Sequence, residues 1–338
     1  MSASRYVAME MAGPGVPPGP VERILPNPGA NEAVVRVHAS SMNFHDVVNL
    51  MGFLEGPWPR VPMSDGVGNV VSIGDQVTNV AIGDRVIGAF HPGWMDGRPT
   101  RENKREMPGD SRDGWLQQYQ LFPANGLIHV PTYLTDHEAA TLPCAGTTAW
   151  SALEIGHIRA GDVVVTQGTG GVSLYALQLA KARGATVILT SSSDEKLEVG
   201  RSLGADLLIN YCATPDWEHE VRKLTEGRGA DLVVDLGGQD TLGRSVKATR
   251  VDGAVAIVGV LSGFGTASIS VSDAMMNNIH LSGITVGSVR AHTDLCAAME
   301  QATIHPHISH RLNWEDMAEA MSIMQAAQHI GKIVIDIP

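Results

Sequence analysis

A strand, a glycine-rich turn, a helix and a second strand follow one another between residues 162 and 191, and this unit constrains the fold most. The stretch DVVVTQ is apolar and β-branched, and Gly168, Gly170 and Gly171 follow it directly. Such glycines permit a tight turn and let the backbone approach a phosphate, while the next helix offers N–H donors and a partial positive charge. We therefore predict a dinucleotide-binding unit whose cofactor contacts include Gly168, Thr169, Gly170, Gly171 and Val172. A plain glycine turn is the alternative.

Serines occupy the end of the second strand, where NAD-preferring sites often carry an acid. An acid would repel a 2′-phosphate, whereas the hydroxyls of Ser191 and Ser192 can donate to it, and Lys196 follows within one helical turn. These residues favour NADPH as the cofactor. Helix capping by the serines and an exposed position for Lys196 are the alternatives. Asp194 and Glu195 keep NADH possible.

The pattern of apolar and polar residues changes along the chain. Residues 1 to about 130 contain short alternating stretches typical of a β-rich domain, and residues 149–286 alternate apolar strands with helices, which is typical of a parallel sheet. The final GKIVIDI could rejoin the first domain. Residues 91–115 form a long polar stretch that we interpret as a loop. Trp58, Trp94 and Trp115 could line an apolar pocket or anchor loops.

Composition excludes several classes of function. The formal net charge of −12 argues against a nucleic-acid surface and against binding to anionic membranes. No apolar run approaches the roughly 20 residues of a membrane helix. We see no secretion signal, and the three cysteines are far apart without a CxxC pair, which favours the reducing cytoplasm.

Several motifs, in their order and spacing, resemble the medium-chain dehydrogenase/reductase superfamily: NFHD (43–46), SDGVGNVVSIG (64–74), ATLPCAGTTAW (140–150), QGTGGVS (167–173) and the terminal GKIVI. The resemblance implies an α/β chain with a GroES-like β-rich catalytic domain at 1–142 and a doubly wound Rossmann NADP-binding domain at 143–287. Residues 288–338 would return to the catalytic domain. It also implies a homodimer that joins the Rossmann sheets edge to edge, with strands expected at 267–271 and 280–286.

The zinc-binding pattern of related alcohol dehydrogenases is incomplete. Their Cys, His and Cys ligands fall on Asn43, Ser64 and Cys144, and a single thiol cannot supply the three protein ligands that catalytic zinc requires. The four clustered cysteines of the structural zinc site are also missing. We therefore predict no metal. The chain resembles the zinc-free, quinone oxidoreductase-like branch, which typically prefers NADPH.

The resemblance also assigns cofactor contacts outside the glycine turn. Thr148 matches a nicotinamide contact, Tyr211 an adenosine-phosphate contact and Lys332 a basic residue near the pyrophosphate. Further contacts are expected at the ends of later strands and in the stretch that meets the carboxamide: Gly237, Val260, Ser262, Val286 and Ser288.

Without zinc, an activated double bond or a quinone is a more accessible target than a simple ketone, because hydrogen-bond donors can stabilise the developing negative oxygen. We expect a small electrophile of this kind, such as a quinone or an enone, with Asn43 and His45 as the catalytic candidates. A structural hydrogen bond is the alternative role of Asn43, and a structural or ribose contact that of His45. The competing functions are an NAD(P)-dependent alcohol dehydrogenase or ketone reductase, and a cofactor-binding protein without turnover.

Overall fold

The computed structural model describes residues 4–53 and 57–338 and divides into two compact units. Unit 1 comprises Met1–Thr147 and Val286–Pro338, and unit 2 comprises Thr148–Thr285. The predicted boundaries after residues 142 and 287 differ from these. A short π-helix, Leu142–Gly146, belongs to unit 1, and the backbone N–H of Cys144 in it donates to Asp65. Where the chain returns to unit 1, the backbone N–H of Val289 donates to Trp94.

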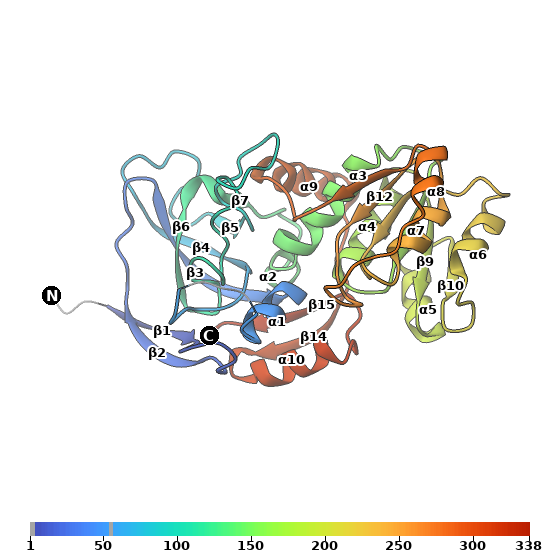
Figure 1. Cartoon of the computed structure of the whole chain (residues 1–338). Helices are drawn as coiled ribbons and strands as arrows, with labels where there is room; N and C mark the ends of the chain where they lie inside the picture. Colours follow the sequence, from blue (N-terminus) through green and yellow to red (C-terminus); the bar gives the residue numbers. More distant parts are fainter. Residues whose placement is uncertain (1–3, 54–56) are drawn as a thin grey trace. The chain divides into compact units, whose positions relative to one another are not determined.

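Unit 1 is built on a mostly antiparallel sheet (Figure 1). Its order is β14 (Ile308–Asn313), β15 (Lys332–Asp336), β3 (Glu32–Met42), β4 (Asp65–Ile73), β5 (Arg85–Gly88) and β7 (Leu127–His129), with β6 (Tyr119–Pro123) paired to β3. The C-terminal β15 runs antiparallel to β3 with Ile333 opposite Met42, so the last strand of the chain rejoins the first domain. The helices of this unit are α1 (Phe44–Leu50), α2 (Asp136–Ala139), α9 (Val289–Ala302) and α10 (Met317–Gln325).

Trp115 lies in the core of unit 1. Its side chain is fully buried and packs against Phe122 at a ring-centroid distance of 5.2 Å. A Cβ atom at Gly66 would lie 2.2 Å from the indole, so only glycine leaves room for it there. The possibility that Trp115 lines a substrate pocket is therefore wrong. The rest of 91–115 contains neither helix nor strand, in agreement with the predicted loop.

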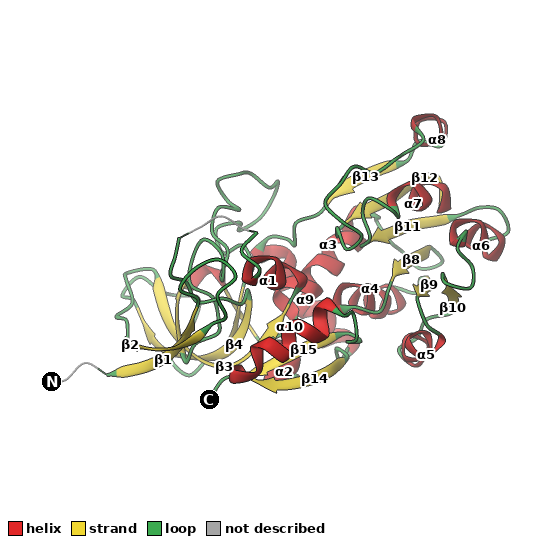
Figure 2. Ribbon diagram, turned by 60° about the horizontal axis from the view of Figure 1, so that its bottom comes forward, coloured by secondary structure: helices red, strands yellow, loops and turns green. Residues whose placement is uncertain are grey.

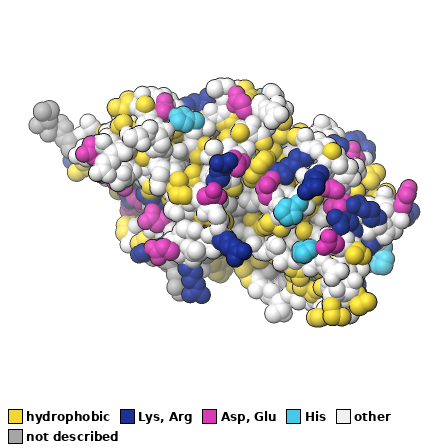
Figure 3. All heavy atoms as spheres, turned by 90° about the horizontal axis from the view of Figure 1, so that it is seen from above, with side chains coloured by type: hydrophobic (Ala, Val, Ile, Leu, Met, Phe, Trp, Pro, Cys, Tyr) yellow, Lys and Arg dark blue, Asp and Glu magenta, His cyan; other side chains and the backbone are white. Residues whose placement is uncertain are grey.

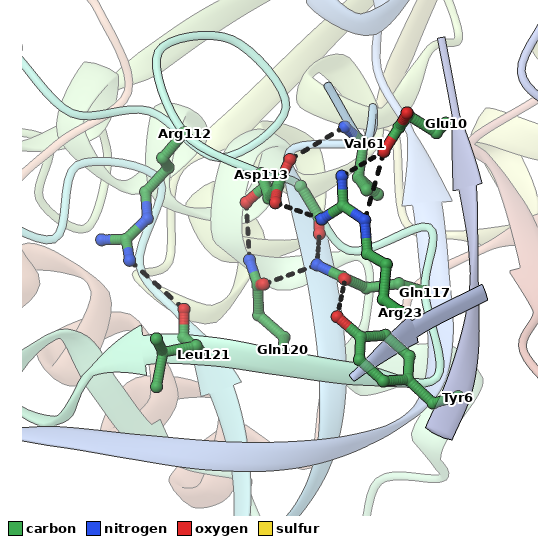
Figure 4. Close-up of polar contacts among 10 residues, drawn as sticks. Tyr6, Glu10, Arg23, Val61, Arg112, Asp113, Gln117, Gln120 and Leu121 are labelled. Carbon is green, nitrogen blue, oxygen red and sulfur yellow. Dashed lines mark hydrogen bonds and ion pairs between the residues drawn. The ribbon is translucent and has the colours of Figure 1, made fainter. Parts of the chain in front are cut away.

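A polar network fastens the hairpin of β1 (Arg5–Glu10) and β2 (Gly19–Ile24) to the segment before β6 (Figure 4). Arg23 bonds to the carboxylates of Glu10 and Asp113, and Asp113 also accepts the backbone N–H of Val61 at 3.0 Å. Tyr6 donates to Gln117 at 3.0 Å. The network lies among β1, β2 and the 113–120 segment, so we regard it as structural.

Unit 2 is a six-stranded parallel sheet with helices on both faces (Figure 2). The order is β10 (Leu207–Asn210), β9 (Thr186–Ser191), β8 (Val163–Gln167), β11 (Ala230–Asp235), β12 (Thr249–Ile257) and β13 (His280–Gly283). Helices α4 (Gly171–Ala182) and α5 (Asp194–Ser202) connect β8, β9 and β10, whereas α6 (Trp217–Leu224) crosses back to β11 and α7 (Leu242–Ala248) leads to β12. The chain also forms α3 (Thr147–Ile155) and α8 (Val271–Met276). The strand order reverses between β8 and β11.

The strand expected at 267–271 is not formed. Ser270 instead caps α8, because its hydroxyl oxygen accepts the backbone N–H of Asp273 at 3.2 Å. The sheet consequently ends at β13, which pairs only with β12 among the described strands. None of the helices in the described ranges has the length and apolar character needed to cross a membrane.

Candidate functional site

The glycine turn of unit 2 leaves open space in front of a helix. Gly168 has a φ of +76°, which favours glycine, and its N–H donates to Thr190 at 2.7 Å. A Cβ atom built on Gly168 or Gly170 meets no heavy atom within 4 Å, so the protein itself does not fill this space. Gly170 precedes α4, whose first N–H groups point toward the helix N-terminus. This cradle fits the pyrophosphate of a dinucleotide.

Ser173, at the third position of the glycine fingerprint, fastens α4 to β8. Its buried hydroxyl donates to the carbonyl oxygen of Gln167 at 2.5 Å. Thr169 lies in the turn and Val172 in the first turn of α4, and their cofactor contacts stay predictions. The sequence-based contacts at Gly171 and Val172 therefore lie at the helix N-terminus.

The three serines at the end of β9, residues 191–193, have different roles. Ser191 is the last residue of β9, and the capping role falls on Ser193, whose hydroxyl oxygen accepts the N–H of Lys196 at 3.3 Å. Capping therefore does not explain Ser191 or the exposed Ser192. Asp194 accepts a hydrogen bond from Asn210 at 2.7 Å. Ser191 is buried. The binding of a 2′-phosphate by Ser191, Ser192 and Lys196 stays a prediction.

The other predicted contacts of unit 2 lie near the carboxyl ends of its strands, with the exception of Thr148. Tyr211 follows β10 and is 40% exposed, and its N–H donates to Ser191 at 3.0 Å. Ser262 braces Gly237, because its hydroxyl donates to the Gly237 carbonyl at 2.7 Å. Val260 is partly exposed beyond β12, and Thr148 is buried at the start of α3.

Asn43 and Asp46 of unit 1 are joined in a capping arrangement at α1. The carboxylate of Asp46 accepts the backbone N–H groups of Asn43 and Ser64, both at 2.8 Å. The side-chain amide of Asn43 donates to the Ser64 hydroxyl at 3.1 Å. The two residues that replace zinc ligands in the family pattern are thus hydrogen-bonded to each other.

Lys332 extends into this same cluster. Its buried ammonium group donates to the backbone carbonyl of Met42 at 2.8 Å and to the Asn43 side-chain oxygen at 2.5 Å, and it lies 3.7 Å from Asp65. The predicted pyrophosphate contact of Lys332 stays untested, but the structure gives its ammonium a different set of partners. Because both ends of the Asn43 amide are engaged, the structure favours the structural role of Asn43 over direct contact with a substrate.

Burial dominates the electrostatics of this cluster, which we define as Asn43, Asp46, Ser64, Asp65 and Lys332. Burial raises the pKa of Asp46 to about 6, against hydrogen bonds from Asn43 and Ser64. Burial also raises the pKa of Asp65 to about 6, and the Lys332 charge opposes this rise. One ammonium group therefore serves two buried carboxylates. Sequence reasoning missed this grouping, although a lysine directly before the apolar strand IVI was its signal.

The residues at the former zinc position do not fit a zinc ion. An amide and a hydroxyl replace two of the ligands, and the Asn43 oxygen already accepts from an ammonium cation. Burial, and next to it the charge of Asp65, raises the pKa of the Cys144 thiol well above its usual range, which disfavours the thiolate that binds metals. Within residues 4–53 and 57–338, no group of three or more His, Cys, Asp or Glu side chains could hold a metal ion.

His45 has a buried nitrogen atom that is free of protein partners. Its ring packs edge-on against Phe90 at a centroid distance of 5.2 Å, and its Nε2 has no hydrogen-bond partner in the described part of the chain. Burial lowers the pKa of His45; Asp110 opposes this shift and Arg60 adds to it. The lowered pKa favours the neutral imidazole, one nitrogen of which can donate a hydrogen bond.

Val286 and Ser288 belong to unit 1. Val286 adopts a φ of +59°, which is uncommon for a β-branched residue and shapes the local backbone. Ser288 caps α9 by accepting the N–H of Ala291 at 3.1 Å. Their predicted contact with a carboxamide stays a prediction.

Two family profiles match the chain. Residues 29–132 match the alcohol dehydrogenase GroES-like domain, and residues 171–302 match the zinc-binding dehydrogenase domain. The chain is 39% identical over 319 residues to the zinc-type alcohol dehydrogenase-like protein C1773.06c of Schizosaccharomyces pombe, covering 92% of each chain. It is 22% identical to acryloyl-coenzyme A reductase of Metallosphaera sedula, over 92% of this chain and 93% of the relative.

Solved structures resemble the whole chain. The crystal structure of a presumed alcohol dehydrogenase from Sinorhizobium meliloti 1021 has a TM-score of 0.93 at 40% identity and full coverage of both chains. The 2-octenoyl-CoA carboxylase reductase CinF, solved with NADP and 2-octenoyl-CoA, has a TM-score of 0.86 at 25% identity, covering 98% of this chain and 87% of that one. The GroES-like and Rossmann predictions are confirmed, and the chain belongs to the medium-chain dehydrogenase/reductase superfamily of oxidoreductases.

Proposed function

We propose that this oxidoreductase uses NADPH to reduce a quinone or a carbonyl-conjugated double bond, and that it does so without zinc. The observation that carries the proposal is the ammonium group of Lys332 bonded to Asn43 at the former zinc position. The Lys332 ammonium group already balances the negative charge of the nearby carboxylates there. A reaction that needs no metal to polarise a carbonyl suits such a site better than alcohol oxidation, in which zinc lowers the pKa of the substrate.

The residues that would hold the cofactor are those of the glycine turn and the end of β9. The N-terminus of α4 would face the pyrophosphate, and Ser191, Ser192 and Lys196 would face a 2′-phosphate. When bound, a reduced nicotinamide supplies the hydride. NADP in the CinF structure supports NADPH, although the family also includes a solved NAD-dependent alcohol dehydrogenase at 31% identity.

The protein side chains would stabilise the oxygen of the substrate that gains negative charge. A neutral His45 can donate one hydrogen bond to this oxygen, in the way that preorganised donors stabilise oxyanions elsewhere. Asn43 would have a supporting role, because its side chain holds Ser64 and Lys332 in place. Two relatives whose names refer to acryloyl-CoA and 2-octenoyl-CoA support a conjugated acceptor.

A second candidate is an NAD(P)-dependent alcohol dehydrogenase or ketone reductase. It is favoured by the name of the 39% identical fission yeast protein. The two candidates differ in their metal requirement and in the substrates they would turn over.

The test is a screen of NADPH and NADH oxidation over enones, quinones and ketones, with zinc content measured on the same preparation. We expect NADPH oxidation with quinones or enones, less than about one zinc per ten chains, and activity that survives chelation, because the site offers about one-third of the ligands that catalytic zinc needs. Stoichiometric zinc that is required for turnover, or oxidation of alcohols alone, would support the second candidate instead.

We also propose a homodimer that pairs through the exposed edge of β13. Apolar side chains are exposed on and near this edge: Phe264, Val271, Met275, Met276 and Leu281. Figure 3 shows hydrophobic side chains scattered over one face of the molecule, with a small group at its lower right edge. Unpaired strand edges and contiguous apolar patches both favour association with a second copy.

The dimer predicts that Met276→Asp, in the patch, yields a monomer in light-scattering chromatography. Ile82→Asp is the matched control, because Ile82 is similarly exposed but lies in unit 1 far from β13 in the sequence. Its oligomeric state should equal that of the wild type. A wild type that is monomeric at micromolar concentration would refute the dimer.

A further inference from the structure

We infer that Gln167 and Asp235 are positioning residues that set the geometry of the cofactor crevice of unit 2 without touching the cofactor. This inference rests on the proposed dinucleotide binding and adds two residues, Gln167 and Asp235, that the sequence analysis did not name as site residues. Both residues are buried, and each is the last residue of its strand, β8 and β11 respectively.

The two side chains join the ends of their strands directly. The Gln167 amide nitrogen donates to Asp235 at 3.2 Å and to Ser245 at 2.8 Å, and the Ser245 hydroxyl donates to Asp235 at 2.5 Å. The Gln167 side-chain oxygen accepts the backbone N–H of Leu236 at 3.2 Å. A bridge between β8 and β11 thus forms through side chains, beyond the ladder of backbone hydrogen bonds.

Asp235 also shapes the loop that follows β11. Its second carboxylate oxygen accepts the N–H of Gly238 and the hydroxyl of Thr241, both at 2.8 Å. Gly238 has a φ of +84°, so this loop turns sharply around the carboxylate. Asp235 forms no ion pair with any described residue, and its buried carboxyl group contacts hydrogen-bond donors instead.

The position of this bridge gives it a function. β8 and β11 are the neighbours between which the strand order of the sheet reverses, and ligands of doubly wound sheets bind outside the carboxyl ends of the strands at this reversal. Gln167 directly precedes the glycine turn, and Asp235 comes just before the Gly237–Gly238 turn. The bridge therefore fixes the two loops that flank the crevice at one separation. Rigid support of this kind commonly determines how precisely a binding site is formed.

Asp235→Asn should weaken NADPH binding by about tenfold or more, as loss of a supporting partner does at other preorganised sites. An amide has one acceptor oxygen where the carboxylate has two, so it cannot accept from Gly238, Thr241, Ser245 and Gln167 together. The double variant Asp235→Asn/Gln167→Glu reverses the polarity of the bridge. The amide introduced on β11 can then donate to the carboxylate introduced on β8, so the double variant should restore a measurable part of the affinity.

Asp231→Asn is the matched control. Asp231 is buried in the same strand but lies near its opposite end, where it pairs with Arg228 and Arg250. Dissociation constants for NADPH and NADH would be measured by fluorescence at a temperature where all variants are folded, with the melting temperature of each variant recorded. We expect the control to lower the melting temperature and to leave the NADPH affinity within about twofold of the wild type.

The outcomes separate the inference from the function on which it rests. A wild type that binds neither nucleotide would refute the proposed cofactor. A wild type that binds NADPH together with an Asp235→Asn variant of unchanged affinity would overturn the positioning role. Equal loss of affinity in Asp235→Asn and Asp231→Asn would also overturn it, since general destabilisation would then explain both.

Discussion

Lys332→Met should lower the free energy of unfolding by about 3–5 kcal/mol, the range found when one partner of a buried ion pair is removed. Methionine replaces the aliphatic part of the side chain but leaves Asp65 and Asp46 buried without their cation, and it removes the donor to Met42 and Asn43. Urea unfolding followed by circular dichroism measures the loss.

Lys181→Met is the matched control for this prediction. Lys181 forms a partly exposed ion pair with Asp206 at 2.8 Å, and pairs of this kind contribute only about 0–1 kcal/mol. The double variant Lys332→Met/Asp65→Asn should recover part of the stability, because the uncompensated carboxylate is gone. In a double-mutant cycle, Lys332 and Asp65 should therefore show a clear coupling energy. If Lys332→Met cost no more than Lys181→Met, the ammonium would not balance the buried carboxylates.

The same variant tests the pyrophosphate contact predicted for Lys332. If the ammonium binds only the partners seen within unit 1, the NADPH affinity of folded Lys332→Met should stay close to that of the wild type. A large loss of NADPH affinity, measured well below the melting temperature, would support the contact that the family resemblance implies.

Local patterns in the sequence predicted the features of the site that local structure determines. The glycine turn was recognisable because the strand, the three glycines and the helix are contiguous, and Gly168 has the positive φ that such a turn requires. The serine that ends β9 was likewise placed correctly by counting from the turn. Periodicity indicated the parallel sheet for the same reason.

Contacts between distant residues were not predictable in this way. Lys332 meets Asn43 across 289 positions, and Gln167 meets Asp235 across 68, so neither pair leaves a local pattern. What the sequence does show is a polar residue at one end of an apolar strand, as in VVVTQ, ADLVVD and KIVI. Such residues are candidates for buried polar contacts, but only the fold identifies their partners.

Competing local signals explain the incorrect expectations. The stretch at 267–271 has the alternation of a strand, but Ser270 satisfies an N–H of the next turn and starts α8. Trp115 was one of three tryptophans with two possible roles, and two glycines on neighbouring strands make room for its ring in the core. The catalytic role of Asn43 stays a prediction; the nearby ammonium and hydroxyl engage both ends of its amide, which favours the structural alternative.

Ser191→Asp should reverse the cofactor preference, with NADPH affinity reduced by at least about tenfold, or roughly 1.4 kcal/mol, and NADH affinity increased. A carboxylate at the end of β9 would repel the 2′-phosphate and accept hydrogen bonds from the ribose hydroxyls of NADH. Dissociation constants for both nucleotides measure the change.

Ser202→Asp provides the matched control, because it adds the same charge to the exposed last residue of α5. It should leave both affinities unchanged, since a solvent-exposed charge beyond a Debye length of about 8–10 Å is largely screened. An unchanged NADPH affinity in Ser191→Asp would mean that the 2′-phosphate is bound elsewhere, with Lys196 and Tyr211 as the next residues to replace. A wild type that already prefers NADH would instead point to Asp194 or Glu195 as the ribose contact, even though Asp194 accepts a hydrogen bond from Asn210 in this structure.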